Sequence, residues 1–155
     1  DTFVPEKSDS FLFLGATGLG KTHLSTAVAK TVIDRYFDVL YVTANEMISV
    51  FEQKKFGSKI NPNEEADTSR YYSADLLIID DLGTEMSTPF SISCVYEIIN
   101  ARMIARKSTI ISTNLGIDEI EKRYWERITS RLLGEYQPIL FVGADIRGQK
   151  LSAKK

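Results

Sequence analysis

An eight-residue loop near the amino terminus restricts the possible folds of this chain more than any other part of the sequence. Its pattern is Gly, any four residues, Gly, Lys and Thr, and it reads Gly15-Ala16-Thr17-Gly18-Leu19-Gly20-Lys21-Thr22. The apolar run 11–14 before it predicts a buried strand, and the residues after it have helical spacing of apolar side chains. A strand, such a loop and a helix in succession indicate a phosphate-binding loop. The sequence therefore predicts an α/β fold with a nucleotide site.

The residue types in this loop suit the binding of phosphate groups. Glycines allow tight turns that direct backbone N–H groups at phosphate oxygens, and the helix that begins near Lys21 adds the positive end of its dipole. Lys21 provides a charge for the outer phosphates, and Thr22 provides a hydroxyl ligand for Mg²⁺. The expected ligands are ATP or ADP with Mg²⁺. A dinucleotide loop is disfavoured because its glycines are spaced differently and it has no use for the lysine.

Composition and charge narrow the class of protein. The 155 residues suit one domain, expected over 1–155, and 43% hydrophobic with 26% charged residues is ordinary for a soluble globular protein. No apolar run is long enough to span a membrane, and the single Cys94, expected to be a buried structural thiol, fits a reducing cytoplasm. His23 is expected to be a polar helix position. The net charge of −2 means that nucleic-acid binding would need a local basic face.

Strand-like and helix-like patterns alternate along the chain. Strands are expected near 11–14, 39–43, 75–80, 109–113 and 139–142. Helices are expected near 21–36, 45–56, 91–106 and 117–132. This alternation predicts a central parallel five-stranded sheet with helices on both faces, a three-layer sandwich. The polar residues 57–70 are expected to form a long surface loop.

Polar side chains follow two of the expected strands. Asp80 comes at the end of the apolar run 76–79, where its carboxylate is placed to hold Mg²⁺. Asp81 follows and is placed to orient or polarise an attacking water. Asn114 ends the strand 109–113, and its amide is placed to hold that water near the γ-phosphate. These residues predict the second half of the nucleotide site.

Three arginines are candidates for contact with phosphates. Arg127 and Arg131 are four residues apart and share one face of a predicted helix. Such pairs are usually a solvated face, but near a phosphate site they stabilise transferred charge, from the same chain or from a neighbour. Arg147 follows the last strand and is placed to reach the phosphates. The residues alone leave these interpretations open.

Six stretches occur in an order that is typical of one family. They are Gly-Ala-Thr-Gly-Leu-Gly-Lys-Thr-His-Leu, Val-Leu-Tyr-Val-Thr-Ala, Asp-Leu-Leu-Ile-Ile-Asp-Asp-Leu-Gly-Thr-Glu, Ile-Ile-Ser-Thr-Asn-Leu, Glu-Arg-Ile-Thr-Ser-Arg-Leu and Gly-Ala-Asp-Ile-Arg. With them the chain resembles, over residues 11–148, the ATPase domain of bacterial DnaC/DnaI-type replicative helicase loaders, which are AAA+ proteins. The resemblance implies a P-loop NTPase fold of the AAA+ type. Because the chain ends soon after Arg147, we expect a reduced or absent helical lid.

The resemblance implies a role for each matching residue. The loop 15–22 looks like Walker A, Asp80 looks like the Walker B metal acid, and Asp81 occupies the catalytic acid position. Asn114 looks like sensor 1 and Arg147 like sensor 2. Many AAA+ proteins have Glu at the catalytic acid position, so the shorter side chain of Asp81 implies slow hydrolysis.

The arginine pair is assigned to assembly by the same resemblance. Arg131 matches the arginine finger, which in this family reaches the ATP of an adjacent subunit, and Arg127 matches a neighbouring interface arginine. The implied activity is therefore ATP hydrolysis that depends on self-association through these two residues.

The implied function is an ATP-dependent switch that places the replicative helicase on single-stranded DNA during DNA replication. The implied partners are that helicase, through an amino-terminal region that we expect to be missing from this fragment, and single-stranded DNA. Basic side chains that would contribute to a DNA-binding face are Lys54, Lys55, Arg102, Arg106 and Lys107. An IstB-type transposition helper ATPase is the alternative with the same fold. A metabolic P-loop kinase is the alternative of another class, and Asn114 and the paired arginines argue against it.

Overall fold

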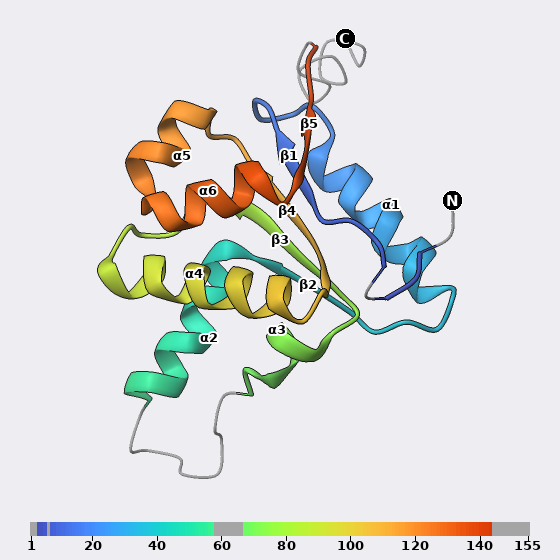
Figure 1. Ribbon diagram of the computed structural model, residues 1–155, viewed down its shortest axis with the longest axis horizontal. Helices are drawn as coiled ribbons and strands as arrows, with labels where there is room; N and C mark the ends of the chain where they lie inside the picture. The colour runs from blue at the N-terminus through green and yellow to red at the C-terminus, as the bar shows by residue number, and fades with distance from the viewer. Residues whose placement is uncertain (1–2, 6, 58–66, 144–155) are drawn as a thin grey trace, which may run out of the picture.

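Strands and helices alternate along the chain, and every paired strand runs parallel to its neighbour (Figure 1). The computed structural model describes residues 3–5, 7–57 and 67–143. In order, the elements are β1 (Phe11–Leu14), α1 (Lys21–Ile33), β2 (Val39–Thr43), α2 (Ala44–Phe56), α3 (Ser69–Ser73), β3 (Leu76–Leu82), α4 (Pro89–Ile104), β4 (Ser108–Thr113), α5 (Ile117–Arg123), α6 (Glu126–Gly134) and β5 (Gln137–Leu140). The sheet order is β2-β3-β4-β1-β5, which confirms the predicted five-stranded parallel sheet.

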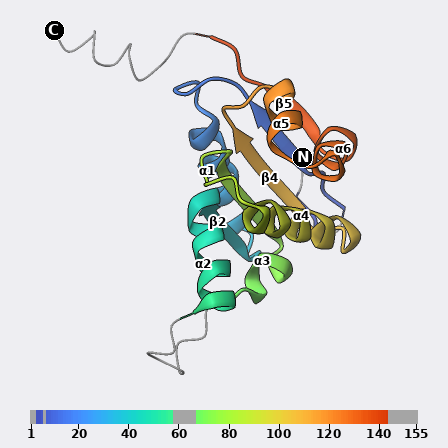
Figure 2. The same ribbon diagram turned by 90° about the vertical axis from the view of Figure 1, so that its left-hand side faces the viewer.

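The sheet lies between two layers of helices (Figure 2). On one face, Ala29 and Val32 of α1 pack against a cluster that includes Ile78 of β3. On the other face, a larger cluster joins Ile79 of β3 to side chains of α2, α3, α4, α5 and α6. Successive residues of β3 therefore enter opposite cores, which is why its sequence is a continuous apolar run.

Local signals in the sequence start two of these helices. Thr43 and Glu46 form a capping box at the first turn of α2, with the Glu46 N–H donating to Thr43 Oγ1 at 3.2 Å and the Thr43 N–H donating to Glu46 Oε2 at 2.8 Å. Thr88 and Ser91 make the matching pair at α4, where Pro89 supplies a preset φ angle. Helix α2 thus begins directly after β2 at the carboxyl edge of the sheet, whereas α4 begins after the residues 83–88 that follow β3.

The last strand lies two residues earlier than the predicted 139–142. The N–H groups of Gln137 and Phe141 donate to the carbonyl oxygens of Ser10 and Leu14 beside β1, at 2.9 and 2.7 Å. Alternate residues of a strand point their N–H groups to opposite sides, so Pro138 faces the open edge, where a missing N–H breaks no ladder. This proline is therefore compatible with an edge strand.

The prediction of one helix at 117–132 was wrong. The chain forms α5 and α6, and between them Tyr124 and Trp125 have extended backbones. Tyr124 is 3% exposed, and its hydroxyl donates to Glu85 Oε1 at 2.5 Å. The burial of this tyrosine, which a helical pattern does not reveal, accompanies the break between the two helices.

The predicted surface loop at 57–70 was wrong at its end. Ser69 and Arg70 begin the short helix α3, and residues 58–66 lie outside the described residues. The guanidinium of Arg102 stabilises α3, because it donates to the carbonyl oxygens of Tyr71, Tyr72 and Ala74 at 3.1, 3.3 and 3.0 Å. Arg102 is 0% exposed, so its predicted place on a DNA-binding surface was also wrong.

Candidate nucleotide-binding site

The glycine-rich loop connects the end of β1 to the start of α1 at the carboxyl edge of the sheet. Gly15 has a φ of 147°, and a side chain there would begin 2.5 Å from the carbonyl oxygen of Phe141, which follows β5. Gly20, at the start of α1, has a left-handed backbone and provides no side-chain cap. The first turn of α1 contains no acidic residue, so its N–H groups remain suited to an anion.

The side chain of Lys21 lies inside this loop and joins it to β4. Lys21 is 5% exposed, and its Nζ donates to the carbonyl oxygens of Gly15 at 2.5 Å and Ala16 at 2.8 Å. It also donates to Oδ1 of Asn114 at 2.8 Å. The structure thus brings together the lysine of the phosphate loop and the amide that follows β4, and both lie where phosphates are expected.

The two aspartates lie at an irregularity in the pairing of β3 with β4. Ile79 pairs with Ile111 and Leu82 pairs with Thr113, so two residues of β3 oppose the single residue Ser112. In a regular strand neighbouring side chains point to opposite faces, whereas a bulge changes their direction locally. Asp81 has a φ of 56°, in the left-handed region that aspartate tolerates better than most residues. The bulge decides how both carboxylates lie.

Both carboxylate oxygens of Asp80 accept hydrogen bonds from hydroxyl groups. Asp80 is 4% exposed; Tyr41 donates to its Oδ2 at 2.8 Å, and Ser112 donates to its Oδ1. Ser112 Oγ also accepts from the N–H of Asp81 at 3.0 Å, so one hydroxyl holds both aspartates. Burial, and then the bond to Asp80, raise the pKa of Tyr41 well above its usual range. The roles of Tyr41 and Ser112 were not predicted, although Tyr41 lies in the stretch Val-Leu-Tyr-Val-Thr-Ala and Ser112 in Ile-Ile-Ser-Thr-Asn-Leu.

The available donors fit Mg²⁺. Asp80 and Thr22 offer a carboxylate and a hydroxyl, the hard oxygen ligands that this ion prefers. No three His, Cys, Asp or Glu side chains gather into a metal cage anywhere in the described ranges. Mg²⁺ in nucleotide sites is usually held by one or two carboxylates together with waters and substrate phosphates.

Comparison with known proteins identifies the family. Residues 2–133 match the family of IstB-like ATP binding proteins. The chain belongs to this family. A relative of this IstB-like domain is the replicative helicase loader DnaC of Escherichia coli (strain K12), which is 28% identical over 133 residues, 85% of this chain and 54% of DnaC. The chain thus spans about half the length of the curated relatives it matches.

Solved structures confirm the predicted P-loop fold of the AAA+ type. A crystal structure of the DnaC helicase loader superposes with a TM-score of 0.75 at 23% identity, over 91% of this chain and 82% of that chain. The AMPPCP-bound DnaA from Aquifex aeolicus gives a TM-score of 0.72 at 23% identity, over 96% of this chain and 45% of that chain. The IstB-like domain therefore has the α/β architecture of these P-loop proteins.

No role was predicted for Glu85, a buried acidic residue after β3. In the IstB-like domain Glu85 is 3% exposed, and its Oε2 accepts from the N–H of Gly83 at 2.8 Å. Tyr124 donates to its Oε1, and Arg123 lies 3.6 Å from the same oxygen. Through these contacts Glu85 links the turn after Asp81 to the junction between α5 and α6. The run Asp-Asp-Leu-Gly-Thr-Glu contained this residue, but only the fold shows its partners.

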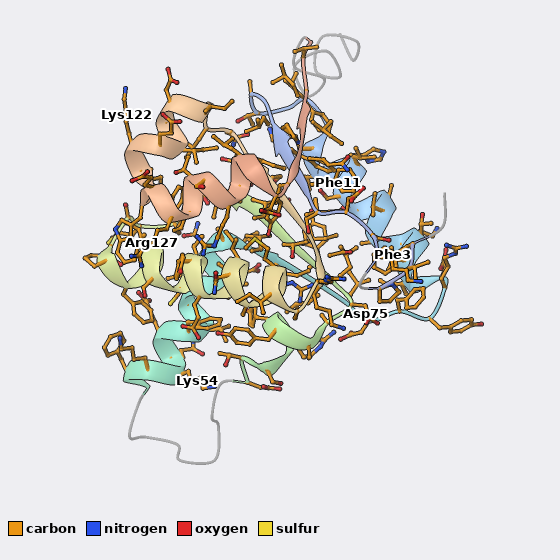
Figure 3. The ribbon with its side chains drawn as sticks, in the orientation of Figure 1. Phe3, Phe11, Lys54, Asp75, Lys122 and Arg127 are labelled. Carbon is orange, nitrogen blue, oxygen red and sulfur yellow. The ribbon has the colours of Figure 1, made fainter. Side chains whose placement is uncertain are left out.

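The arginine pair of the IstB-like domain lies on α6, and Arg127 appears in Figure 3 on the side of α4 and α6. Arg131 donates to Asn100 Oδ1 at 3.0 Å, and its guanidinium lies 5.0 Å from the ring centre of Tyr96 on α4. It also donates to the carbonyl oxygen of Arg127 at 2.8 Å. These contacts join α6 to α4 rather than to the phosphate loop, so action of Arg131 on a neighbouring subunit stays a prediction.

Four remaining expectations have simple outcomes. Arg147 lies outside the described residues, as does any lid beyond residue 143. Cys94 is buried as predicted, and burial raises its pKa to about 11. His23 is exposed on the first turn of α1, as predicted for a polar helix position. Across the described ranges, no helix has both the length and the apolar character needed to cross a bilayer.

Proposed function

We propose that this domain binds Mg²⁺-ATP and hydrolyses it slowly, as the ATPase part of a protein that places the replicative helicase on single-stranded DNA. The observation that supports this most is the position of Lys21. Its ammonium group touches both the glycine-rich loop and Asn114, which follows β4, the neighbour of the strand β3 that contains Asp80. A buried cation at the carboxyl edge of β1, β4 and β3 lies where the phosphates of a nucleoside triphosphate bind in such folds.

Different residues of the site are proposed to bind the phosphates and the Mg²⁺ ion. The backbone N–H groups of 15–22 hold the phosphates, and Lys21 neutralises their outer charge. Thr22 and Asp80 would hold Mg²⁺, which would supply positive charge to neutralise the phosphates. Arg147 is proposed as a further phosphate contact, by resemblance alone.

The residues beyond the loop prepare the hydrolytic step. Asp81 orients the attacking water and takes its proton, and Asn114 holds that water in line. The transferred charge would be stabilised by Arg131 of an adjacent subunit. The side chain of Asp81 is short, and the arginine would come from an adjacent subunit. The isolated domain is therefore expected to hydrolyse ATP slowly.

Replacement of Lys21 tests the nucleotide site. Lys21→Ala removes a buried charge that faces the phosphates, so the Kd for ATP measured by calorimetry should rise by about tenfold to a hundredfold. Lys30→Ala, an exposed lysine in the last turn of the same helix, is the matched control and should leave the Kd unchanged. Equal affinity of the Lys21→Ala variant and the parent protein would show that the site is elsewhere.

The choice between loader and transposition helper depends on the partner. The relative DnaC supports the loader, whereas the family description supports the IstB-type helper. The decisive experiment offers the full-length protein both partners, a hexameric replicative helicase and a transposase, and measures complex formation with ATP and Mg²⁺. Binding to the helicase alone supports the loader, and binding to the transposase alone overturns it.

Single-stranded DNA is the proposed nucleic-acid partner, with binding stronger in the presence of ATP. Phe56 is 67% exposed, and the ammonium of Lys55 lies over the rings of Phe56 and Phe90, at 5.4 and 4.7 Å from their centres. Aromatic faces beside a cation suit base stacking and phosphate contact. We expect weak binding by the full-length protein that falls steeply between 50 and 200 mM salt, by about tenfold or more. Salt-insensitive binding, or none with ATP present, would contradict a DNA role.

A further inference from the structure

A tyrosine from β2 contacts Asp80, the aspartate proposed to bind Mg²⁺. Tyr41 pairs with Ile78 of β3, and Thr43 pairs with Asp80. The Tyr41 side chain therefore extends diagonally across the sheet, and its hydroxyl reaches Asp80 Oδ2 at 2.8 Å. This contact joins residues 39 positions apart in the sequence.

The two hydroxyl groups on Asp80 differ in how firmly they are held. Ser112 is fixed because its oxygen also accepts the N–H of Asp81, on the backbone of the bulge. The hydrogen bond that the structure describes for the Tyr41 hydroxyl goes to a side chain, the carboxylate of Asp80. Tyr41 can thus turn away from Asp80 without breaking a backbone hydrogen bond.

A carboxylate as buried as Asp80 needs a partner for each oxygen, because an unpaired buried charge is strongly unfavourable. When Mg²⁺ and nucleotide bind, an oxygen of Asp80 has to face the ion or one of its waters. Because Ser112 also accepts the N–H of Asp81, the Tyr41 hydroxyl is the partner of Asp80 that can yield to the ion or to one of its waters.

We propose that Tyr41 takes the place of the metal ion on Asp80 while no Mg²⁺ is bound, and that Mg²⁺ binds by displacing this hydrogen bond. The inference rests on the proposed nucleotide site and adds a residue that weakens Mg²⁺ binding. Tyr41 would stabilise the metal-free domain and so set the Mg²⁺ concentration at which the site fills.

Tyr41→Phe tests this, because phenylalanine keeps the ring and removes the hydroxyl. The Kd of a non-hydrolysable ATP analogue is measured by calorimetry with Mg²⁺ and with EDTA, in the parent protein and in the variant. Loss of the hydroxyl leaves Asp80 Oδ2 unpaired only in the metal-free state. The ratio of the EDTA value to the Mg²⁺ value should therefore rise about tenfold in the variant. An unchanged or smaller ratio overturns the proposal, since Tyr41 would then be a bystander or an aid to the metal.

Thermal unfolding gives a second measurement that does not depend on the metal-free affinity. Tyr41→Phe should lower the Tm without ligand, and saturating Mg²⁺-nucleotide should restore most of the difference. A Tm difference of the same size in both conditions would mean that Tyr41 is only structural.

Two control variants separate the possible causes. Tyr36→Phe makes the same chemical change on a side chain that is 98% exposed, and it should leave the Kd ratio unchanged. In an Asp80→Asn background, Tyr41→Phe should no longer raise the ratio, because the carboxylate is gone. If the parent protein binds no nucleotide at all, the proposed site fails. If it binds and the ratio does not change, only the role of Tyr41 fails.

Discussion

At the scale of single residues, Asp81 combines an unusual backbone with a proposed chemical role. Its φ of 56° places it in the left-handed region, and its carbonyl oxygen accepts bonds from the N–H and the hydroxyl of Thr84 at 3.2 and 2.9 Å. Aspartate and asparagine tolerate this region because their short polar side chains bond locally. A substitution meant to probe the chemistry therefore has to keep the backbone as well.

Asparagine meets that condition at position 81. Asp81→Asn should leave the Kd for ATP nearly unchanged and reduce turnover by about a hundredfold, because an amide is a poor base. Both values are measured on the same preparation, by calorimetry and by phosphate release. Asp118→Asn, an exposed aspartate in the first turn of α5, is the matched control. Turnover equal to that of the parent protein would remove Asp81 from the mechanism.

At the scale of elements, one buried arginine connects α4 to two other elements. In addition to the α3 carbonyl groups, Arg102 donates to Thr109 Oγ1 at 2.9 Å and to the carbonyl oxygen of Ser108 at 2.7 Å, at the start of β4. Burial lowers its pKa to about 10, so the guanidinium stays charged at neutral pH. Helix α3 has five residues, too few to be stable by itself, so it depends on such contacts.

Removal of this guanidinium should therefore destabilise the domain. Arg102→Met fills much of the same volume but leaves several buried carbonyl groups without a donor, so the free energy of unfolding should fall by about 3 kcal/mol or more. Arg35→Met changes an exposed arginine, and its effect should stay within about 0.5 kcal/mol. Denaturant unfolding measures both, and similar values for the two variants would contradict the proposed role of Arg102.

At the scale of the whole molecule, the two proposed cationic groups belong to helices in different layers. Lys21 is the first residue of α1, whereas Arg131 packs on α4. Helices α1 and α4 lie on opposite faces of the sheet (Figures 1 and 2). A site that needs both charges would have to be shared between subunits. Activity per subunit should then rise with protein concentration.

Mixing two inactive variants tests a shared site. Arg131→Ala should bind ATP almost normally but lose the rise in activity with concentration, and Lys21→Ala should lose nucleotide binding. Mixed assemblies contain some sites with an intact lysine from one subunit and an intact arginine from the next, so phosphate release should recover on mixing. If assembly is verified and the mixture stays inactive, Arg131 is a structural residue that joins α6 to α4.

The sequence by itself determined the features that short stretches encode. The phosphate loop, the strands 11–14 and 39–43 and the two aspartates that follow the apolar run 76–79 can be predicted from glycine spacing, apolar runs and position, which are local properties. The break at Tyr124, the burial of Arg102 and the bulge opposite Ser112 depended on tertiary structure. Each arises from contact between side chains that are far apart in the sequence. Only the strand order β2-β3-β4-β1-β5 places Tyr41 and Ser112 on either side of Asp80, and no local pattern reports that order.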